Sequence, residues 1–182
     1  MNTALRNLVA ALALCSGVAA NADTIQVTNA GLEVAETRYA LHADFRLDLG
    51  PSLLEALSNG LSLGFLVEFE LIRPRWYWLN EKLVSKRQQY RLGYNALTRQ
   101  YRVGIGTLYQ NFGSLPEALA FLSRVRLRDI VETGALAKGN RYTAALRMRL
   151  DSSQLPRPFQ ISAVGSREWS VGSDWHRWAV SP

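Results

Sequence analysis

Alternation of apolar and polar side chains is the dominant pattern of this chain, and residues 90–105 show it most clearly. Aromatic and apolar side chains occupy every second position on both sides of a short polar turn. These positions are Tyr90, Leu92, Tyr94, Tyr101, Val103 and Ile105. Because successive side chains of a strand point to opposite faces, the segment is predicted to form a β-hairpin with one apolar face, around which further strands pair.

The same alternation predicts most of the remaining strands. It is strictest from Arg38 to Leu49, which indicates a strand with one buried and one solvated face. Further strands are predicted over residues 61–73, 125–131, 142–150 and 168–180, the last as one strand or a pair. Residues 24–36, with a turn expected at 29–31, indicate an edge strand or two short ones. Residues 76–89 indicate a strand that enters the hairpin through a bulge or a change of sheet.

Two short helices are predicted in the connections between strands. Pro51 suits the first turn of a helix over residues 51–58. Ser114 and Glu117 form a capping box that begins the second helix. The chain has 182 residues, of which 48% are hydrophobic, and this is enough for one core. We therefore predict an all-β fold, a single antiparallel β-sandwich of immunoglobulin-like or C2-like type that spans residues 23–182.

The first 22 residues have the pattern of a leader rather than of a folded element. Arg6 precedes a short apolar run, Leu8–Leu14, and an A-x-A motif ends at Ala22. This pattern predicts a signal peptide cleaved after Ala22, and therefore an exported, periplasmic protein. A lipoprotein signal at Cys15 is the less favoured alternative, because the residue before that cysteine is large. Cys15 is the only cysteine, so the processed chain would have no disulfide and no thiol chemistry.

Residues able to carry catalysis are few. The chain has two histidines and shows no phosphate-binding loop, nucleophile elbow or metal-ligand spacing. His42 and Asp44 share the polar face of a strand and could form a base oriented by a carboxylate, although a solvated histidine is favoured. Glu68 and Glu70 are more typical of the outer face of a strand than of a glycosidase pair. No catalytic residue, metal or cofactor is therefore expected.

Arginines and aromatic residues form the most distinctive surface candidates. Such residues can stack on sugar rings, hold a phosphate or anchor a protein interface, although core and edge packing is the competing explanation. The candidate binding residues are Arg73, Arg75, Trp76, Tyr77, Trp78 and Arg99. Basic stripes on the outer faces of the sheets are a further expectation, with solvated arginines beside carboxylates as the alternative. The residues concerned are Arg91, Arg99, Arg102, Arg147 and Arg149. Nucleic acid is not an expected partner, since the net charge is only +6 and export separates the protein from it.

Several local strings together resemble one known family. They are residues 74–78, 94–101, 145–151, 155–159 and 173–175. In these strings the chain is similar to DUF4390, a family of small exported bacterial proteins of unknown function. The resemblance supplies no catalytic residues. It implies a role in the cell envelope near a sensor, because genes of the family tend to lie beside those of a membrane sensor kinase of the nitrogen-regulation type and its response regulator.

Three functional hypotheses follow from these observations. The first is a non-enzymatic periplasmic domain that binds a partner, such as the extracytoplasmic part of a membrane sensor kinase, through residues 73–78. The second is a binder of a small molecule, glycan or anionic lipid that uses the same segment and contacts the membrane peripherally. The third, least favoured, is a hydrolase built on His42 and Asp44.

Overall fold

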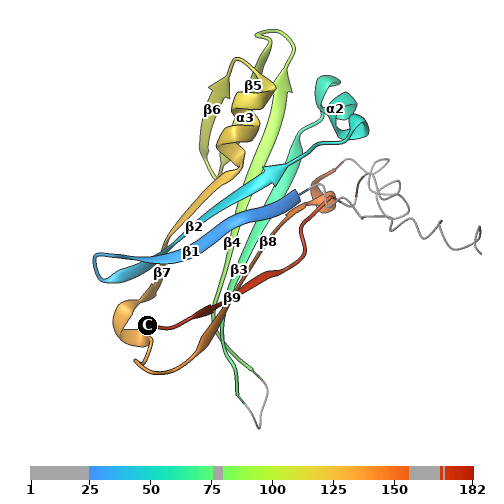
Figure 1. Ribbon diagram of the computed structural model, residues 1–182. Helices are drawn as coiled ribbons and strands as arrows, with labels where there is room; N and C mark the ends of the chain where they lie inside the picture. Colours follow the sequence, from blue (N-terminus) through green and yellow to red (C-terminus); the bar gives the residue numbers. More distant parts are fainter. Residues whose placement is uncertain (1–24, 76–79, 156–168, 170) are drawn as a thin grey trace, which may run out of the picture.

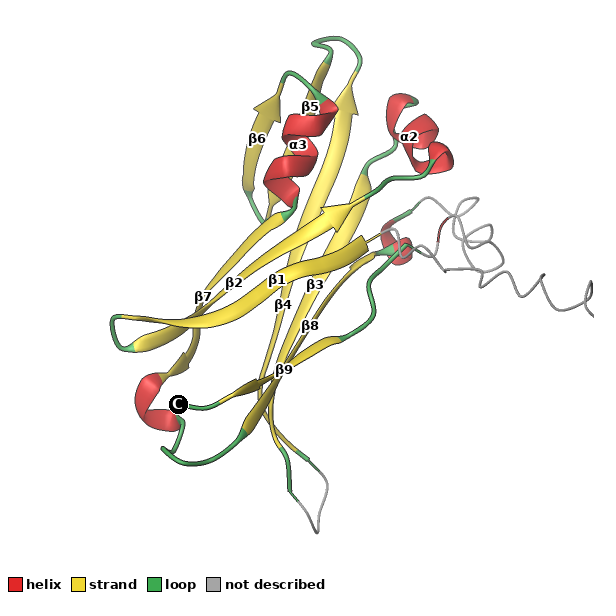
Figure 2. Cartoon of the chain, in the orientation of Figure 1, coloured by secondary structure: helices red, strands yellow, loops and turns green. Residues whose placement is uncertain are grey.

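The computed structural model describes residues 25–75, 80–155, 169 and 171–182, and these form two facing antiparallel sheets (Figure 1). The small sheet has the order β1-β2-β7, with β1 at Ile25–Ala35, β2 at Arg38–Leu47 and β7 at Arg124–Glu132. The large sheet has the order β6-β5-β4-β3-β8-β9. Its strands are β3 (Leu63–Arg73), β4 (Glu81–Asn95), β5 (Gln100–Ile105), β6 (Leu108–Phe112), β8 (Tyr142–Leu150) and β9 (His176–Val180). The predicted all-β sandwich is confirmed (Figure 2).

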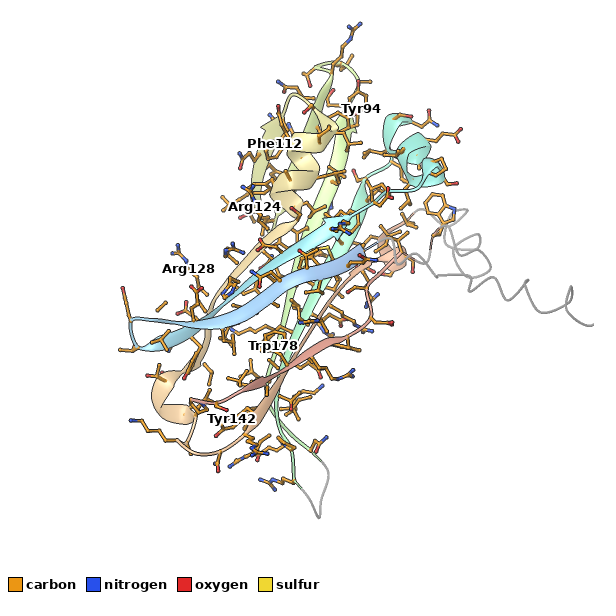
Figure 3. The ribbon with its side chains drawn as sticks, viewed as in Figure 1. Tyr94, Phe112, Arg124, Arg128, Tyr142 and Trp178 are labelled. Carbon is orange, nitrogen blue, oxygen red and sulfur yellow. The ribbon has the colours of Figure 1, made fainter. Side chains whose placement is uncertain are left out.

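Two short α-helices lie in the connections, as predicted. They are α2 (Pro51–Ser58) and α3 (Leu115–Leu122), and single turns of 3-10 helix occur at η1 (Thr133–Ala135) and η2 (Ser152–Gln154). The Ser114 hydroxyl accepts a hydrogen bond from the Glu117 backbone N–H at 3.4 Å, which satisfies one of the free donors at the start of α3. The helix packs against β5 and β6, where Phe112 lies (Figure 3). The Phe112 and Phe121 rings are 5.3 Å apart.

The core lies between the sheets and follows from the period-two pattern. The inward side chains of β3 are Leu63, Phe65, Val67, Phe69 and Leu71, and each is fully buried. They face the buried residues of β2, among them Leu41 and Phe45. Removal of this apolar surface from water is the main force that holds the two sheets together.

The hairpin predicted at residues 90–105 is present in the expected register. Tyr90 pairs with Ile105, and Tyr94 with Tyr101, whose rings lie 4.8 Å apart. The Asn95 side-chain oxygen accepts hydrogen bonds from the backbone N–H groups of Leu97 and Thr98 and thereby stabilises the turn.

One local prediction was wrong. No turn occurs at residues 29–31, because β1 is one edge strand whose register shifts between Val27 and Asn29. Of the two alternatives for the strand that enters the hairpin, the structure shows a bulge and no change of sheet. Strand β4 pairs with β3, and Leu83 forms a bulge between the pairs Leu71–Val84 and Ile72–Lys82. Strand β6 was not predicted. The leader and most of the family string at residues 155–159 lie outside the described residues.

Candidate functional site

The end of the β3–β4 hairpin brings two of the predicted binding residues together. Glu81 Oε2 accepts hydrogen bonds from Arg73 Nε at 3.0 Å and from Arg75 Nη2 at 2.6 Å. The Asn80 side chain also accepts a hydrogen bond from the Arg75 backbone N–H. We call Glu81 with its two arginines the Glu81 clamp. Trp76, Tyr77 and Trp78 lie outside the described residues.

The Glu81 clamp is open to solvent and carries a net charge of +1. About a third of the Glu81 side chain is exposed, and the two arginines are exposed slightly more. The pKa of Glu81 is lowered, mainly by the hydrogen bond from Arg75. Desolvation tends to raise this pKa, and the hydrogen bond from Arg73 lowers it further. Glu81 is therefore ionised at neutral pH and holds both arginines at the end of the hairpin, which lies at one extremity of the molecule (Figure 1).

Arg99 does not join this pair. It lies in the turn between β4 and β5 with a positive φ of 54°. That turn is at the opposite end of β4, and a strand of 15 residues spans about 50 Å. The sequence alone could not place Arg99 relative to Arg73, because the length of β4 was not apparent from its charged first half.

A second cluster of arginines surrounds Glu68 on the outer face of the large sheet, the face turned away from the small sheet. Glu68 Oε2 accepts hydrogen bonds from Arg147 Nε at 2.7 Å and from Arg149 Nε at 3.2 Å. Arg87 Nε lies 3.3 Å from the other carboxylate oxygen. We call these four residues the Glu68 cluster. The strand order places them, because β3 carries Glu68 between Arg87 on β4 and the two arginines on β8.

Glu68 is the single buried charged side chain in the described part of the chain. Desolvation tends to raise the pKa of its carboxyl group, but hydrogen bonds and charge from Arg147 and Arg149 outweigh that effect and lower the pKa. The outer-face position of Glu68 was predicted, but its burial was missed. Its arginines are distant in sequence, and the strand pairing was unknown.

Arg91, Arg102, Arg147 and Arg149 lie on this outer face, whereas Arg99, the fifth arginine considered for a basic stripe, lies in the turn between β4 and β5. The four arginines have different partners. Arg91 donates to the Gln154 side chain at 3.5 Å. Arg102 donates to the Asn111 side chain at 3.1 Å and lies 5.7 Å from the Tyr109 ring centroid. Carboxylate neighbours are therefore found for the arginines of β8, while Arg91 and Arg102 contact amides.

His42 and Asp44 do not form the dyad that the sequence offered as the less favoured alternative. His42 Nδ1 lies 3.2 Å from Glu33 Oε1, without hydrogen-bond geometry, and Asp44 instead lies 3.6 Å from Arg126. The His42 ring packs over Gly31 on β1, where an added Cβ would come within 2.5 Å of the ring. A general base oriented by Asp44 is thus not assembled in this conformation.

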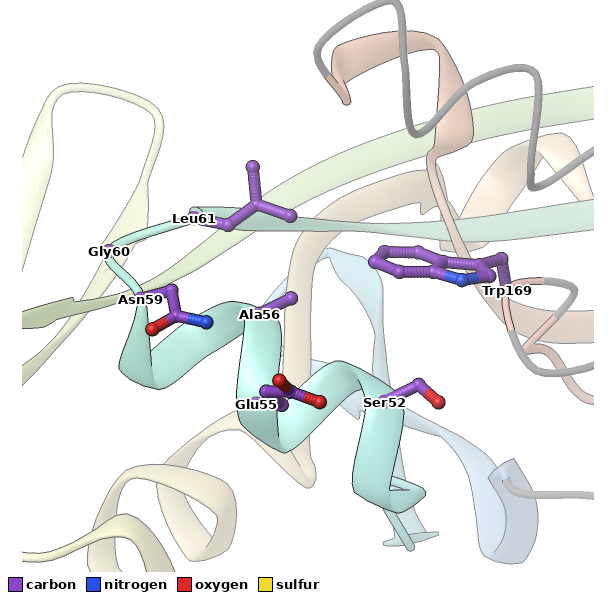
Figure 4. Close-up of a pocket in the computed structure, with 7 residues that line it drawn as sticks. All are labelled: Ser52, Glu55, Ala56, Asn59, Gly60, Leu61 and Trp169. Carbon is purple, nitrogen blue, oxygen red and sulfur yellow. The ribbon is translucent and has the colours of Figure 1, made fainter.

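A surface cavity of about 510 Å³ lies beside α2 (Figure 4). Polar residues of the helix line one wall, and the Trp169 side chain lies across from them. The lining residues are Ser52, Glu55, Ala56, Asn59, Gly60, Leu61 and Trp169. A few polar groups beside an aromatic surface are typical of small-ligand sites, and no sequence pattern indicated this one.

Within the described residues, no three histidine, cysteine or acidic side chains converge as metal ligands would. None of the described helices is long and apolar enough to cross a membrane.

Comparison with known proteins identifies the family. The model of the domain of unknown function DUF4390 matches residues 22–179, and the chain therefore belongs to that family. No curated protein and no solved structure matches. This confirms the family assignment made from the five local strings. The finer assignment to an immunoglobulin-like or C2-like topology stays a prediction.

Proposed function

We propose that this DUF4390 protein is an exported, non-enzymatic binding domain that captures a protein partner in the periplasm through the end of the β3–β4 hairpin. The observation that carries this proposal is the Glu81 clamp, in which one carboxylate holds Arg73 and Arg75 at the end of the molecule. The proposed partner is the extracytoplasmic part of a membrane sensor kinase.

The clamp supports this role because it restricts two long side chains before any partner arrives. Binding orders flexible side chains at a cost of about 0.5–1.5 kcal/mol each, and prior restraint lowers that cost. The clamp keeps one positive charge in excess, which suits an acidic surface on the partner. Next to it in the sequence are Trp76, Tyr77 and Trp78, the residue types that dominate binding energy at protein interfaces.

The contacts of His42 and Asp44, on the outer face of the small sheet, support the proposal of a non-enzymatic role. His42 faces Glu33 rather than Asp44, and Asp44 contacts Arg126. The link to a sensor kinase draws on the gene neighbourhood that the family resemblance implies.

The test is a pull-down from envelope extract with the protein purified after export, followed by mass spectrometry of what is retained. We expect a sensor kinase to be recovered with the native protein and lost with the double variant Arg75→Ala/Trp76→Ala. Arg99→Ala is the matched control, because it removes an exposed arginine from the opposite end of β4 and should leave capture unchanged. Capture that survives the double variant, with the fold intact, would place the interface elsewhere.

The same experiment distinguishes the alternative function. A co-purified small molecule, glycan or anionic lipid without any protein would favour a ligand-binding module. The cavity beside α2 is the described feature that best suits a small molecule or glycan, since its polar wall faces an indole ring.

A further inference from the structure

The Glu68 cluster contains more positive charge than its carboxylate can balance. Three guanidinium groups surround one carboxylate, so the cluster carries a net charge of +2. Glu68 is buried by the arginines, with 6% of its side chain exposed, whereas Arg87 exposes 71% and Arg149 39%. The excess charge therefore lies on the solvent side of the cluster.

The remaining acidic groups near this face have partners of their own. Glu70 is paired with Lys82. Asp151 accepts hydrogen bonds from the side chains of Gln89 and Gln154. Asp151 also interacts with the charge of Arg149, but no ion pair between them is formed. Within the described residues, Glu68 is the one carboxylate in ion-pair contact with Arg87 or Arg149.

The contacts with Glu68 leave hydrogen-bond donors available for a second anion. Arg149 and Arg87 reach the carboxylate through Nε, the donor nearest the aliphatic stem. Their terminal Nη groups have no hydrogen-bond partner among the described residues. Arginine presents five N–H donors in a fixed fork, and this fork matches the oxygens of a phosphate group.

The segment before β9 fixes the other side of the cluster. The guanidinium carbon of Arg147 lies 4.5 Å from the centroid of the Trp175 ring, a cation–π contact. Gly172 pairs with Arg149, and an added Cβ at residue 172 would lie 3.1 Å from the Arg149 Cβ. The Gly172 position thus leaves room for the stem of Arg149, while Trp175 fixes Arg147.

We propose that the Glu68 cluster is a binding site for a phosphate monoester, held by the solvent-facing donors of Arg87, Arg147 and Arg149. A phosphate monoester carries a charge of about −1.5 to −2 at neutral pH, which complements the charge of the cluster. Glu68 acts beneath the site as the group that orients the three guanidiniums and offsets their mutual repulsion. This site lies on a different surface from the Glu81 clamp and does not depend on the proposed protein partner.

The ligand could be a free phosphate or the headgroup of a lipid, and one set of titrations separates the two. The probes are inorganic phosphate, vesicles of phosphatidylcholine alone, and vesicles that also contain phosphatidic acid, whose headgroup is a phosphate monoester. We expect saturable binding of inorganic phosphate by calorimetry at constant ionic strength. Binding only to the vesicles with phosphatidic acid would identify the phosphate as a lipid headgroup and would support the site equally, provided that the variants below abolish it.

The key variant is Arg87→Gln/Arg149→Gln, which should weaken binding at least tenfold while Arg147 continues to hold Glu68. The matched control is Arg46→Gln/Arg128→Gln, which removes the same charge from exposed positions of the small sheet. Arg149→Lys provides a variant that keeps the charge but loses the planar fork, and it should bind several-fold more weakly even if the double variant folds poorly. The proposal is overturned if neither probe binds, if the control weakens binding as much as the key variant, or if Arg149→Lys binds as tightly as the native protein.

Discussion

Glu68 and Glu81 both hold several arginines, yet their surroundings differ. Glu68 lies in the middle of the large sheet with 6% of its side chain exposed, whereas Glu81 lies at a hairpin end with 34% exposed. Desolvation is the largest single influence on the pKa of Glu68, and the hydrogen bond from Arg75 is the largest on that of Glu81. We therefore expect the same pairing of carboxylate and guanidinium to contribute to sheet stability in one place and to orient surface groups in the other.

The substitution Glu68→Gln should have the largest effect. It removes the charge shared by three arginines and leaves them next to one another in a partly desolvated position. We expect the free energy of unfolding to fall by about 2–3 kcal/mol, the upper part of the range for hydrogen bonds to a charged group and below the loss of a fully buried ion pair, because the arginines stay partly exposed. Urea denaturation measures this, with Glu70→Gln as the control on the same strand face. A loss no larger than that of the control would mean that the cluster contributes little to stability.

Acidification should remove the contribution of Glu68 without a mutation. Its pKa in the folded state is lowered from 4.5, so the associated stability is present above that value and is lost as pH falls through the lowered pKa. We expect the difference in the free energy of unfolding between the native protein and Glu68→Gln to have its full value at pH 7. The difference should decrease as pH falls below 4.5 and disappear below the lowered pKa of Glu68. Urea midpoints measured across that range test this, and a difference independent of pH would contradict the ionised state assigned to Glu68.

The substitution Glu81→Gln should have the smallest effect on stability. The clamp is exposed, and water can replace the carboxylate as a partner of both arginines. We expect an unfolding midpoint close to that of the native protein but weaker capture of the protein partner, because Arg73 and Arg75 lose their common anchor. A large loss of stability would show that the hairpin end supports the sandwich, and the contrast with Glu68 would no longer hold.

The fold was predictable because the pattern that defines it is local. The alternating residues of β2, β3 and β8 and the hairpin at Tyr90–Ile105 specify which side of each strand is buried before any pairing is known. The capping pattern at Ser114 likewise specifies a helix start from four consecutive positions. Strand β6 was missed because four of its five residues are exposed, so it lacks the buried apolar face from which the other strands were predicted.

The sites were less predictable because they depend on strand order. Arg147 meets Glu68 across 79 positions of sequence, and only the pairing of β3 with β8 brings them together. Arg73 and Arg75 were selected from their aromatic neighbours, while the role of Glu81 became apparent only from the hairpin register. Alternation identifies the face on which a charged residue lies, but not which charges share that face.

The contact between Gly31 and His42 has a consequence for how this chain can change over evolutionary time. Because the end of the imidazole ring occupies the space of a side chain at residue 31, a larger residue there requires the partly exposed His42 ring to turn away. The two positions are therefore coupled in evolution. Relatives that carry a larger residue at position 31 should have either a smaller residue opposite it or a histidine whose ring points outward.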